Sequence, residues 1–326
     1  MKKIKISSLW NSTVDLNSSV IINLIKILSK RDIEFTTIEQ SDILFFGPYE
    51  KHSIINYIKR RILNSLKKKN NNIEKLFPNI DFYLLNRKIK PLKIFLSWEN
   101  FQFPNIKYDF AITSFLGINN DNHLRFPLWK NYIDWSHLDL AREEDPYIKR
   151  FDTYYKIENL LKPQGENFMG KPRKICLISS HLNEPRFSIY KILSKKFQVD
   201  GYGPIFNKKI KDHYSNPISK KNILKNYAFN LCPENSLYPG YYTEKIPEAF
   251  LSQCLPITWS DDNVDYDFNS KSFINLLNYT KDNYSEISEL IKDNNFLKKF
   301  TNEPLLLKRL NLDEEIKFAK KIIQCL

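Results

Sequence analysis

The strongest constraint on the fold is a regular alternation of short apolar segments with amphipathic helical patterns. Residues 3–7 and 42–47 have the apolar content of buried strands, and residues 20–29 between them carry apolar side chains at helical spacing. The same alternation recurs between residues 175 and 202. Strands that are separated by helices usually pair in parallel. The sequence therefore predicts an α/β fold built on parallel sheets.

The chain is long enough for two domains. Its 326 residues fit two units of about 150 residues each. Residues 155–174 contain prolines and glycines that interrupt regular structure, which is typical of a linker. We predict an N-terminal domain over residues 1–160 and a C-terminal domain over residues 161–326. An amphipathic pattern at residues 313–323 predicts a helix at the end of the second domain.

Composition favours a soluble protein in a reducing compartment. The sequence is 42% hydrophobic, and its mean hydropathy is -0.46. The basic first residues are not followed by the apolar stretch of a secretory signal, and no apolar run approaches the roughly 20 residues that span a membrane. The four cysteines show no paired metal-ligand spacing. We expect a cytoplasmic location.

The formal net charge of +13 favours phosphate-rich partners, which include sugar nucleotides, anionic membranes and nucleic acids. Residues 54–69 have the pattern of a basic amphipathic helix. Such a helix commonly covers a sheet with a solvated lysine face, and the alternative is peripheral contact with the cytoplasmic face of the inner membrane. Aromatic side chains do not interleave with the basic residues at 59–69. We therefore expect no nucleic-acid partner, and a basic nucleic-acid-binding protein is kept as the alternative from a different class.

Residues 227–259 have the pattern of a strand, a polar loop, a helix and a second strand. Thr243 is a suitable N-cap, which predicts a helix that begins close to Glu244 and Lys245. Ligands of parallel sheets bind beyond the carboxyl ends of strands, where the N–H groups of a helix start attract phosphate. Lys245 would add a positive charge, and Glu244 could accept hydrogen bonds from ribose hydroxyls.

A second candidate position lies where an earlier predicted strand ends. Residues 92–98 have the pattern of a strand that delivers Glu99 and Asn100 to the carboxyl edge of the sheet. A carboxylate at this edge can take a proton from a reacting hydroxyl. The alternative is a structural carboxylate that caps a loop.

The sequence Phe-Asn-Leu-Cys-Pro-Glu-Asn-Ser at 229–236, followed by Tyr-Tyr-Thr-Glu-Lys at 241–245, resembles the signature of the α-1,3-fucosyltransferase family. The resemblance extends to Trp-Glu-Asn at 98–100, to Arg-Phe-Pro-Leu at 125–128 and to Arg186. It covers roughly residues 96–273. It implies a GT-B type fold, in which two Rossmann-like domains face a cleft.

The resemblance also implies an inverting glycosyltransferase that moves L-fucose from GDP-fucose to a hydroxyl, such as O3 of N-acetylglucosamine. The acceptor would be an oligosaccharide or a lipid-linked glycan of a bacterial surface, such as lipopolysaccharide O-antigen, or a protein glycan. The implied site consists of Glu99 as the catalytic base, Arg186 and Lys245 near the diphosphate, Glu244 near the ribose, Glu234, Asn235 and Tyr241 near the donor, and Trp98 and Asn100 on the acceptor side.

No Asp-X-Asp triplet follows a predicted strand near these residues, and Asp261 with Asp262 reads as a turn or a cap. We expect no metal ligand and no required cofactor, and stimulation by a divalent cation is left open. Pro233 and Ala228 stand where the family commonly has an aromatic residue and a lysine. An alternative donor is therefore another GDP-linked 6-deoxyhexose. A glycan-binding relative without catalysis is a further alternative.

Overall fold

The computed structural model describes residues 2–9, 19–47, 91–100, 107–140, 151, 153–206, 219–280, 284 and 286–326. The basic amphipathic helix expected at residues 54–69 lies outside these residues, so its contact with a membrane stays a prediction. Within the described ranges, no helix is both long enough and apolar enough to cross a membrane.

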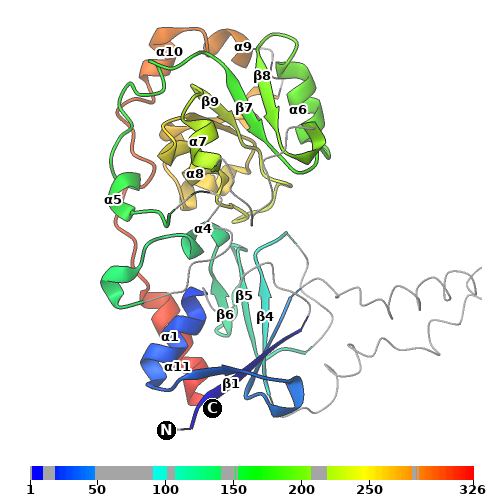
Figure 1. The fold of residues 1–326 in the computed structure, drawn as a ribbon, viewed down its shortest axis with the longest axis vertical. Helices are drawn as coiled ribbons and strands as arrows, with labels where there is room; N and C mark the ends of the chain where they lie inside the picture. The colour runs from blue at the N-terminus through cyan, green and yellow to red at the C-terminus, as the bar shows by residue number, and fades with distance from the viewer. Residues whose placement is uncertain are drawn as a thin grey trace, which may run out of the picture.

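The first domain is built on a parallel sheet of six strands in the order β2-β1-β3-β4-β5-β6 (Figure 1). The central strands are buried on both faces, as is usual where helices cover a parallel sheet. In sequence order the strands are β1 (Ile4–Leu9), β2 (Ile33–Phe35), β3 (Ile43–Phe46), β4 (Leu92–Ser97), β5 (Phe110–Thr113) and β6 (His123–Arg125). Helix α1 (Val20–Ser29) packs its apolar side against this sheet, and α4 (Leu128–Asn131) follows β6.

The last helix of the chain, α11 (Asp313–Gln324), packs against α1 of the first domain. Figure 1 shows this red helix beside α1, with the C-terminus at the end of the molecule far from the second domain. Phe318 of α11 contacts the Phe110 ring edge-on, at 5.4 Å between the ring centroids. The predicted boundary near residue 160 stays a prediction, but the terminal helix belongs to the first core and not to the second domain. The buried apolar side of α11 packs against α1.

The second domain has a parallel sheet of five strands in the order β11-β10-β9-β7-β8. The strands are β7 (Ile175–Ile178), β8 (Val199–Tyr202), β9 (Phe229–Leu231), β10 (Leu255–Thr258) and β11 (Ile274–Asn275). The α-helices are α6 (Arg186–Leu193), α7 (Lys220–Leu224), α8 (Lys245–Leu251), α9 (Ile287–Leu290) and α10 (Asn294–Lys298). Short 3-10 helices lie at Ile38–Gln40, Ser136–Leu138, Pro204–Phe206, Asp262–Tyr266, Ser270–Ser272 and Leu276–Tyr279.

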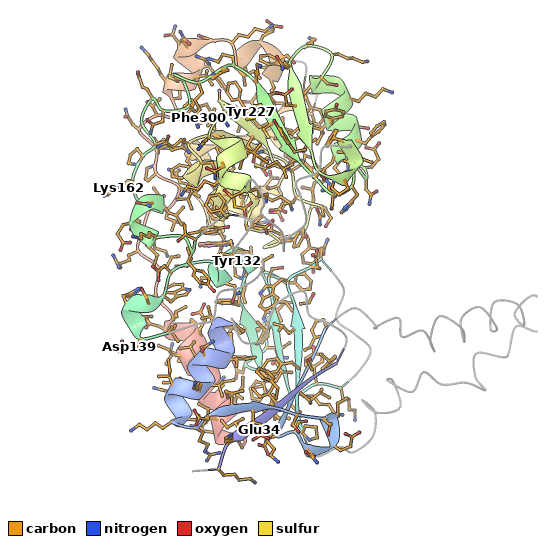
Figure 2. The ribbon with its side chains drawn as sticks, in the orientation of Figure 1. Glu34, Tyr132, Asp139, Lys162, Tyr227 and Phe300 are labelled. Atoms are coloured by element: carbon orange, nitrogen blue, oxygen red, sulfur yellow. The ribbon has the colours of Figure 1, made fainter. Side chains whose placement is uncertain are left out.

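The two domains are connected by two segments of chain that run beside each other. Figure 1 shows α5 (Ile157–Leu160) on the first segment and the orange-red return to α11 on the second. Leu306 donates its N–H to the Leu160 carbonyl at 2.9 Å, which ties the two segments together. Tyr132, labelled in Figure 2, lies at the end of the first domain that meets the second, and its ring contacts Tyr155. This arrangement brings the carboxyl ends of strands from both sheets to the junction.

Candidate active site

The site forms where loops that follow β4 and β9 meet across the domain junction. Glu99 and Asn100 come directly after β4, and Asn235 and Ser236 follow β9. Asn100 Nδ2 donates to Ser236 Oγ at 2.7 Å. Tyr241 Oη donates to Glu99 Oε2 at 2.9 Å. The carboxyl ends of strands from both domains therefore contribute side chains to one place, as open parallel sheets do at their ligand sites.

Glu99 lies in a partly buried position among charged groups. Burial raises the pKa of its carboxyl above the usual value, while the Tyr241 hydrogen bond and the Lys245 charge act in the opposite direction. The carboxylates of Glu244 and Glu234 add to the upward shift. A carboxylate with a raised pKa is a stronger proton acceptor than an exposed one. The geometry fits the base expected at this position.

Glu234 is fully buried and joins the start of α8 to the loop before it. Its carboxylate accepts hydrogen bonds from the Thr243 backbone N–H at 2.8 Å, from the Thr243 hydroxyl, and from Lys245 Nζ at 2.5 Å. Burial alone would lower the Lys245 pKa, but the carboxylates of Glu234 and Glu244 raise it, and the net shift is upward. Lys245 is therefore a cation held in a fixed position.

The expectation that Thr243 caps this helix is wrong. Helix α8 begins at Lys245 as predicted, but Glu244 occupies the N-cap position and makes no side-chain capping bond. The Thr243 hydroxyl is already bonded to Glu234. A buried carboxylate requires hydrogen-bond donors more strongly than a helix start requires a cap, because an unpaired buried charge costs more than an unpaired N–H group.

Arg186 is the first residue of α6 and is buried. Its guanidinium donates to Ser179 Oγ at 2.9 Å and to His181 Nε2 at 2.7 Å. Burial lowers the Arg186 pKa, and the charges of Glu234 and Glu99 act against this shift. Arg186 is therefore close enough to Glu234 and Glu99 for their charges to act on it. His181 orients the arginine through this contact.

The remaining predicted residues differ in their exposure. Asn235 is exposed, and its Nδ2 donates to Tyr241 Oη at 3.3 Å. Glu244 is half-buried and lies 3.9 Å from Lys220 Nζ. Trp98 is only 2% exposed, and its Nε1 donates to the Phe126 carbonyl. The structure therefore places Trp98 in the core beneath Glu99, and its assignment to the acceptor side stays a prediction.

Sequence reasoning missed two side chains of the cluster, Lys220 and Ser236. Lys220 at the start of α7 pairs with Glu248 of α8 and lies near Glu244. Ser236 makes a cross-domain bond. Neither has a spacing signal, because both contacts join segments that are distant in the sequence.

The described residues contain no group of three or more His, Cys, Asp or Glu side chains that could hold a metal. Asp261 caps the short helix Asp262–Tyr266, since its carboxylate accepts from the Asn263 N–H at 2.9 Å. The interpretation of Asp261 as a cap is confirmed. The expectation that no cofactor is required stays a prediction.

Comparison with known proteins identifies the second domain. The model of glycosyltransferase family 10 (fucosyltransferase), C-terminal part, matches residues 168–303. This part of the chain is a glycosyltransferase family 10 domain. The match includes the strand, loop and helix that carry Glu234, Tyr241 and Lys245. The resemblance on which the sequence analysis relied is confirmed.

Curated fucosyltransferases share parts of this chain's sequence. The α-(1,3)-fucosyltransferase FucT of Helicobacter pylori is 30% identical over 218 residues, which cover 61% of this chain and 43% of the relative. The human 4-galactosyl-N-acetylglucosaminide 3-α-L-fucosyltransferase 9 is 28% identical over 131 residues, which cover 38% of this chain and 34% of the relative. The chain thus spans less than half the length of each of these relatives.

The fold is shared more widely than the sequence. A crystal structure of an α1,3-fucosyltransferase aligns over 99% of this chain and 90% of its own length, with a TM-score of 0.66 at 22% identity. A crystal structure of an α1,3-fucosyltransferase with GDP-fucose aligns over the same shares, with a TM-score of 0.65. The predicted fold class, GT-B type with two Rossmann-like domains, is confirmed.

Proposed function

We propose that this chain is an inverting glycosyltransferase that moves L-fucose from GDP-fucose to an acceptor hydroxyl. The proposal rests chiefly on one observation, the meeting of Glu99 with the Tyr241 to Lys245 segment of the family 10 domain at the domain junction. The cations Lys245 and Arg186 lie near Glu99, whose carboxyl has a raised pKa. A glycosyl transfer needs both, because the acceptor must lose a proton and the departing diphosphate must be neutralised.

In the proposed mechanism the acceptor oxygen attacks the anomeric carbon from the side opposite the leaving GDP. Glu99 removes the proton of the acceptor hydroxyl as the new C–O bond forms. This is the role of the base in inverting glycosidases, with a sugar hydroxyl in place of water. The bond between the anomeric carbon and the diphosphate oxygen breaks, and the configuration at carbon inverts.

Arg186 and Lys245 serve the leaving group in this mechanism. A diphosphate is already a good leaving group, so it needs positive charge more than it needs a proton. The Arg186 guanidinium can hold two phosphate oxygens, and the Lys245 ammonium acts as a point charge. Glu244 accepts hydrogen bonds from the ribose, while Glu234 holds Lys245 in place. We propose that no metal cofactor is required.

The acceptor belongs to the same proposal. The human relative is named for transfer to a 4-galactosyl-N-acetylglucosaminide, which supports O3 of an N-acetylglucosamine unit as the attacked group. We propose an oligosaccharide or lipid-linked glycan of a bacterial surface, such as lipopolysaccharide O-antigen, modified in the cytoplasm. Contact with the inner membrane through residues 54–69 would bring the enzyme to a lipid-linked acceptor.

The test is turnover of GDP-fucose with N-acetyllactosamine, with the product's anomeric configuration read by NMR. We expect inversion, and we expect Glu99→Gln to lower kcat by about 10²–10⁴-fold while the Kd for GDP changes little. Glu289→Gln, which removes an exposed carboxylate of α9 in the second domain, should leave kcat unchanged. Retention of configuration, or full activity of Glu99→Gln, would contradict the mechanism.

The second candidate is transfer from another GDP-linked 6-deoxyhexose, for which Pro233 is the favouring observation. Pro233 is buried beside Glu234 in the loop after β9, where the family resemblance leads us to expect an aromatic side chain. Ala228 is fully buried within the second core, so its difference from the family does not bear on the donor directly. Transfer rates with several GDP-sugars as donors separate the candidates. Absence of transfer from GDP-fucose would favour the second.

A further inference from the structure

A chain of two hydrogen bonds links Glu99 of the first domain to the loop of the second. Asn235 Nδ2 donates to Tyr241 Oη at 3.3 Å, and Tyr241 Oη donates to Glu99 Oε2 at 2.9 Å. Tyr241 is 2% exposed, and its backbone N–H is bonded to the Tyr238 carbonyl at 3.0 Å. The tyrosine is therefore a fixed donor to the carboxylate.

We propose that Tyr241 is a positioning residue for the base, whose hydroxyl holds Glu99 Oε2 across the domain junction and leaves Oε1 for the acceptor hydroxyl. This inference rests on the proposed function of Glu99. It adds a role for Tyr241 toward the base to the donor contact that the family resemblance implies. The carboxylate and the tyrosine come from different domains, so the base is oriented only when the domains are together.

The direction of the hydrogen bonds follows from the groups involved. A tyrosine hydroxyl has one proton to give and lone pairs that accept. The Asn235 amide nitrogen can only donate, so the Tyr241 proton is directed to Glu99. Burial raises the Tyr241 pKa above its usual range, and the charges of Glu234 and Glu99 raise it further. Tyr241 therefore remains a donor throughout the working pH range.

The electrostatic surroundings of Glu99 determine what loss of this hydroxyl would do. Burial raises the Glu99 pKa, as do the carboxylates of Glu244 and Glu234. The Tyr241 hydrogen bond and the Lys245 charge hold it down, and Arg186 also interacts with Glu99. Removal of the hydroxyl takes away the largest of the lowering contributions. The Glu99 pKa should then rise further, because a hydrogen bond to the ionised form favours that form.

The first experiment reads the carboxylate directly. The full chain is labelled with ¹³C at the glutamate carboxyl carbons, and the Glu99 signal is identified by its loss in Glu99→Gln. We expect the titration midpoint of this signal to move to higher pH in Tyr241→Phe. Tyr242→Phe is the matched control, because it removes the hydroxyl of an adjacent buried tyrosine that is bonded to Asp261. Its Glu99 midpoint should equal that of the wild type, and equal midpoints in all three proteins would overturn the inference.

A second experiment separates this inference from the proposed function. GDP release from GDP-fucose is followed against pH. The acid limb of the kcat/KM profile reports the pKa of the base in the free enzyme. This limb should therefore move to higher pH in Tyr241→Phe and stay in place in Tyr242→Phe. A wild type without GDP release would reject the proposed function even if the carboxylate midpoint moves. A wild type that turns over, with an unmoved acid limb in Tyr241→Phe, would reject only the role of Tyr241.

Discussion

At the scale of single residues, His123 makes the stability of the first domain depend on pH. Its ring Nε2 lies 2.7 Å from the Thr113 hydroxyl. Burial and then the charge of Arg125 lower the His123 pKa to about 4. A histidine in the unfolded chain titrates near pH 6.5, so between about pH 6.5 and about pH 4 the unfolded state binds a proton that the native state does not. The native state therefore loses stability as the pH falls through this window.

We expect His123→Gln to reduce this loss, because glutamine can bond to Thr113 without taking up a proton. The measurement is the urea midpoint at pH 7.5 and at pH 4.5, and the difference between the two should be smaller in the variant than in the wild type. His137→Gln removes an exposed imidazole and serves as the control. An equal difference in all three proteins would show that His123 does not contribute.

The individual residues also show how far the sequence can predict this site. Glu99 could be assigned to the site, because a residue that follows a buried parallel strand lies at the ligand edge of the sheet. The pairing of Glu234 with Lys245 could not be predicted, since it depends on how the loop between them turns. Trp98 was assigned to the acceptor side from resemblance, and its burial follows from packing that no sequence pattern reports.

At the scale of elements, the loop between β9 and α8 depends on Gly240. This glycine has φ of +92°, and a Cβ there would lie 2.3 Å from the Ser114 carbonyl oxygen and 2.8 Å from the Leu116 nitrogen. Leu116 N–H also donates to the Pro239 carbonyl at 3.0 Å. The loop that carries Tyr241 therefore docks on the end of β5 only because position 240 has no side chain.

We expect Gly240→Ala to destabilise the protein and to separate this loop from β5. Gly117→Ala is the matched control, because Gly117 has φ of +76° with no atom within 4 Å of the added Cβ. The control should lose about 1–2 kcal/mol from backbone strain alone, and Gly240→Ala should lose about 1–3 kcal/mol more from the steric overlap. Urea denaturation measures both, and equal losses would mean that the loop adapts freely.

Most strands could be predicted from sequence, but three short edge strands could not. The alternation expected between residues 175 and 202 is formed by β7, α6 and β8, and the second strand expected within residues 227–259 is β10. Strands β2, β6 and β11 were missed, and each lies at the edge of its sheet. They have only two or three residues. A segment of two or three residues is too short to show the alternation of apolar and polar side chains that marks a strand. It forms a strand because the neighbouring strand has unpaired backbone N–H and C=O groups.

At the scale of the whole molecule, Arg125 ties the two domains together. Its Nη1 and Nη2 donate to the two carboxylate oxygens of Asp267 at 2.8 and 2.9 Å, and Nη2 also donates to the Gly240 carbonyl at 3.2 Å. Its Nε donates to the Ser114 carbonyl of its own domain at 2.9 Å. Trp129 Nε1 donates to the same carboxylate at 2.9 Å. One guanidinium thus connects the end of β5, the loop before Tyr241 and the second domain.

We expect Arg125→Lys to weaken this connection, because an ammonium cannot reproduce the planar bidentate pairing or reach all of these acceptors. The Asp267 carboxylate is only 5% exposed, so loss of its partner should cost about 3 kcal/mol of stability. Hydrogen exchange of the Leu116 N–H, which bonds to the second domain, should accelerate, while exchange in β1 stays unchanged. Arg309→Lys alters an ion pair with Glu158 in which both side chains are more than half exposed, and it should cost about 1 kcal/mol or less. If Arg125→Lys behaves like Arg309→Lys, the other contacts of the junction are sufficient to hold the domains together, and the orientation of Glu99 by Tyr241 does not depend on the arginine.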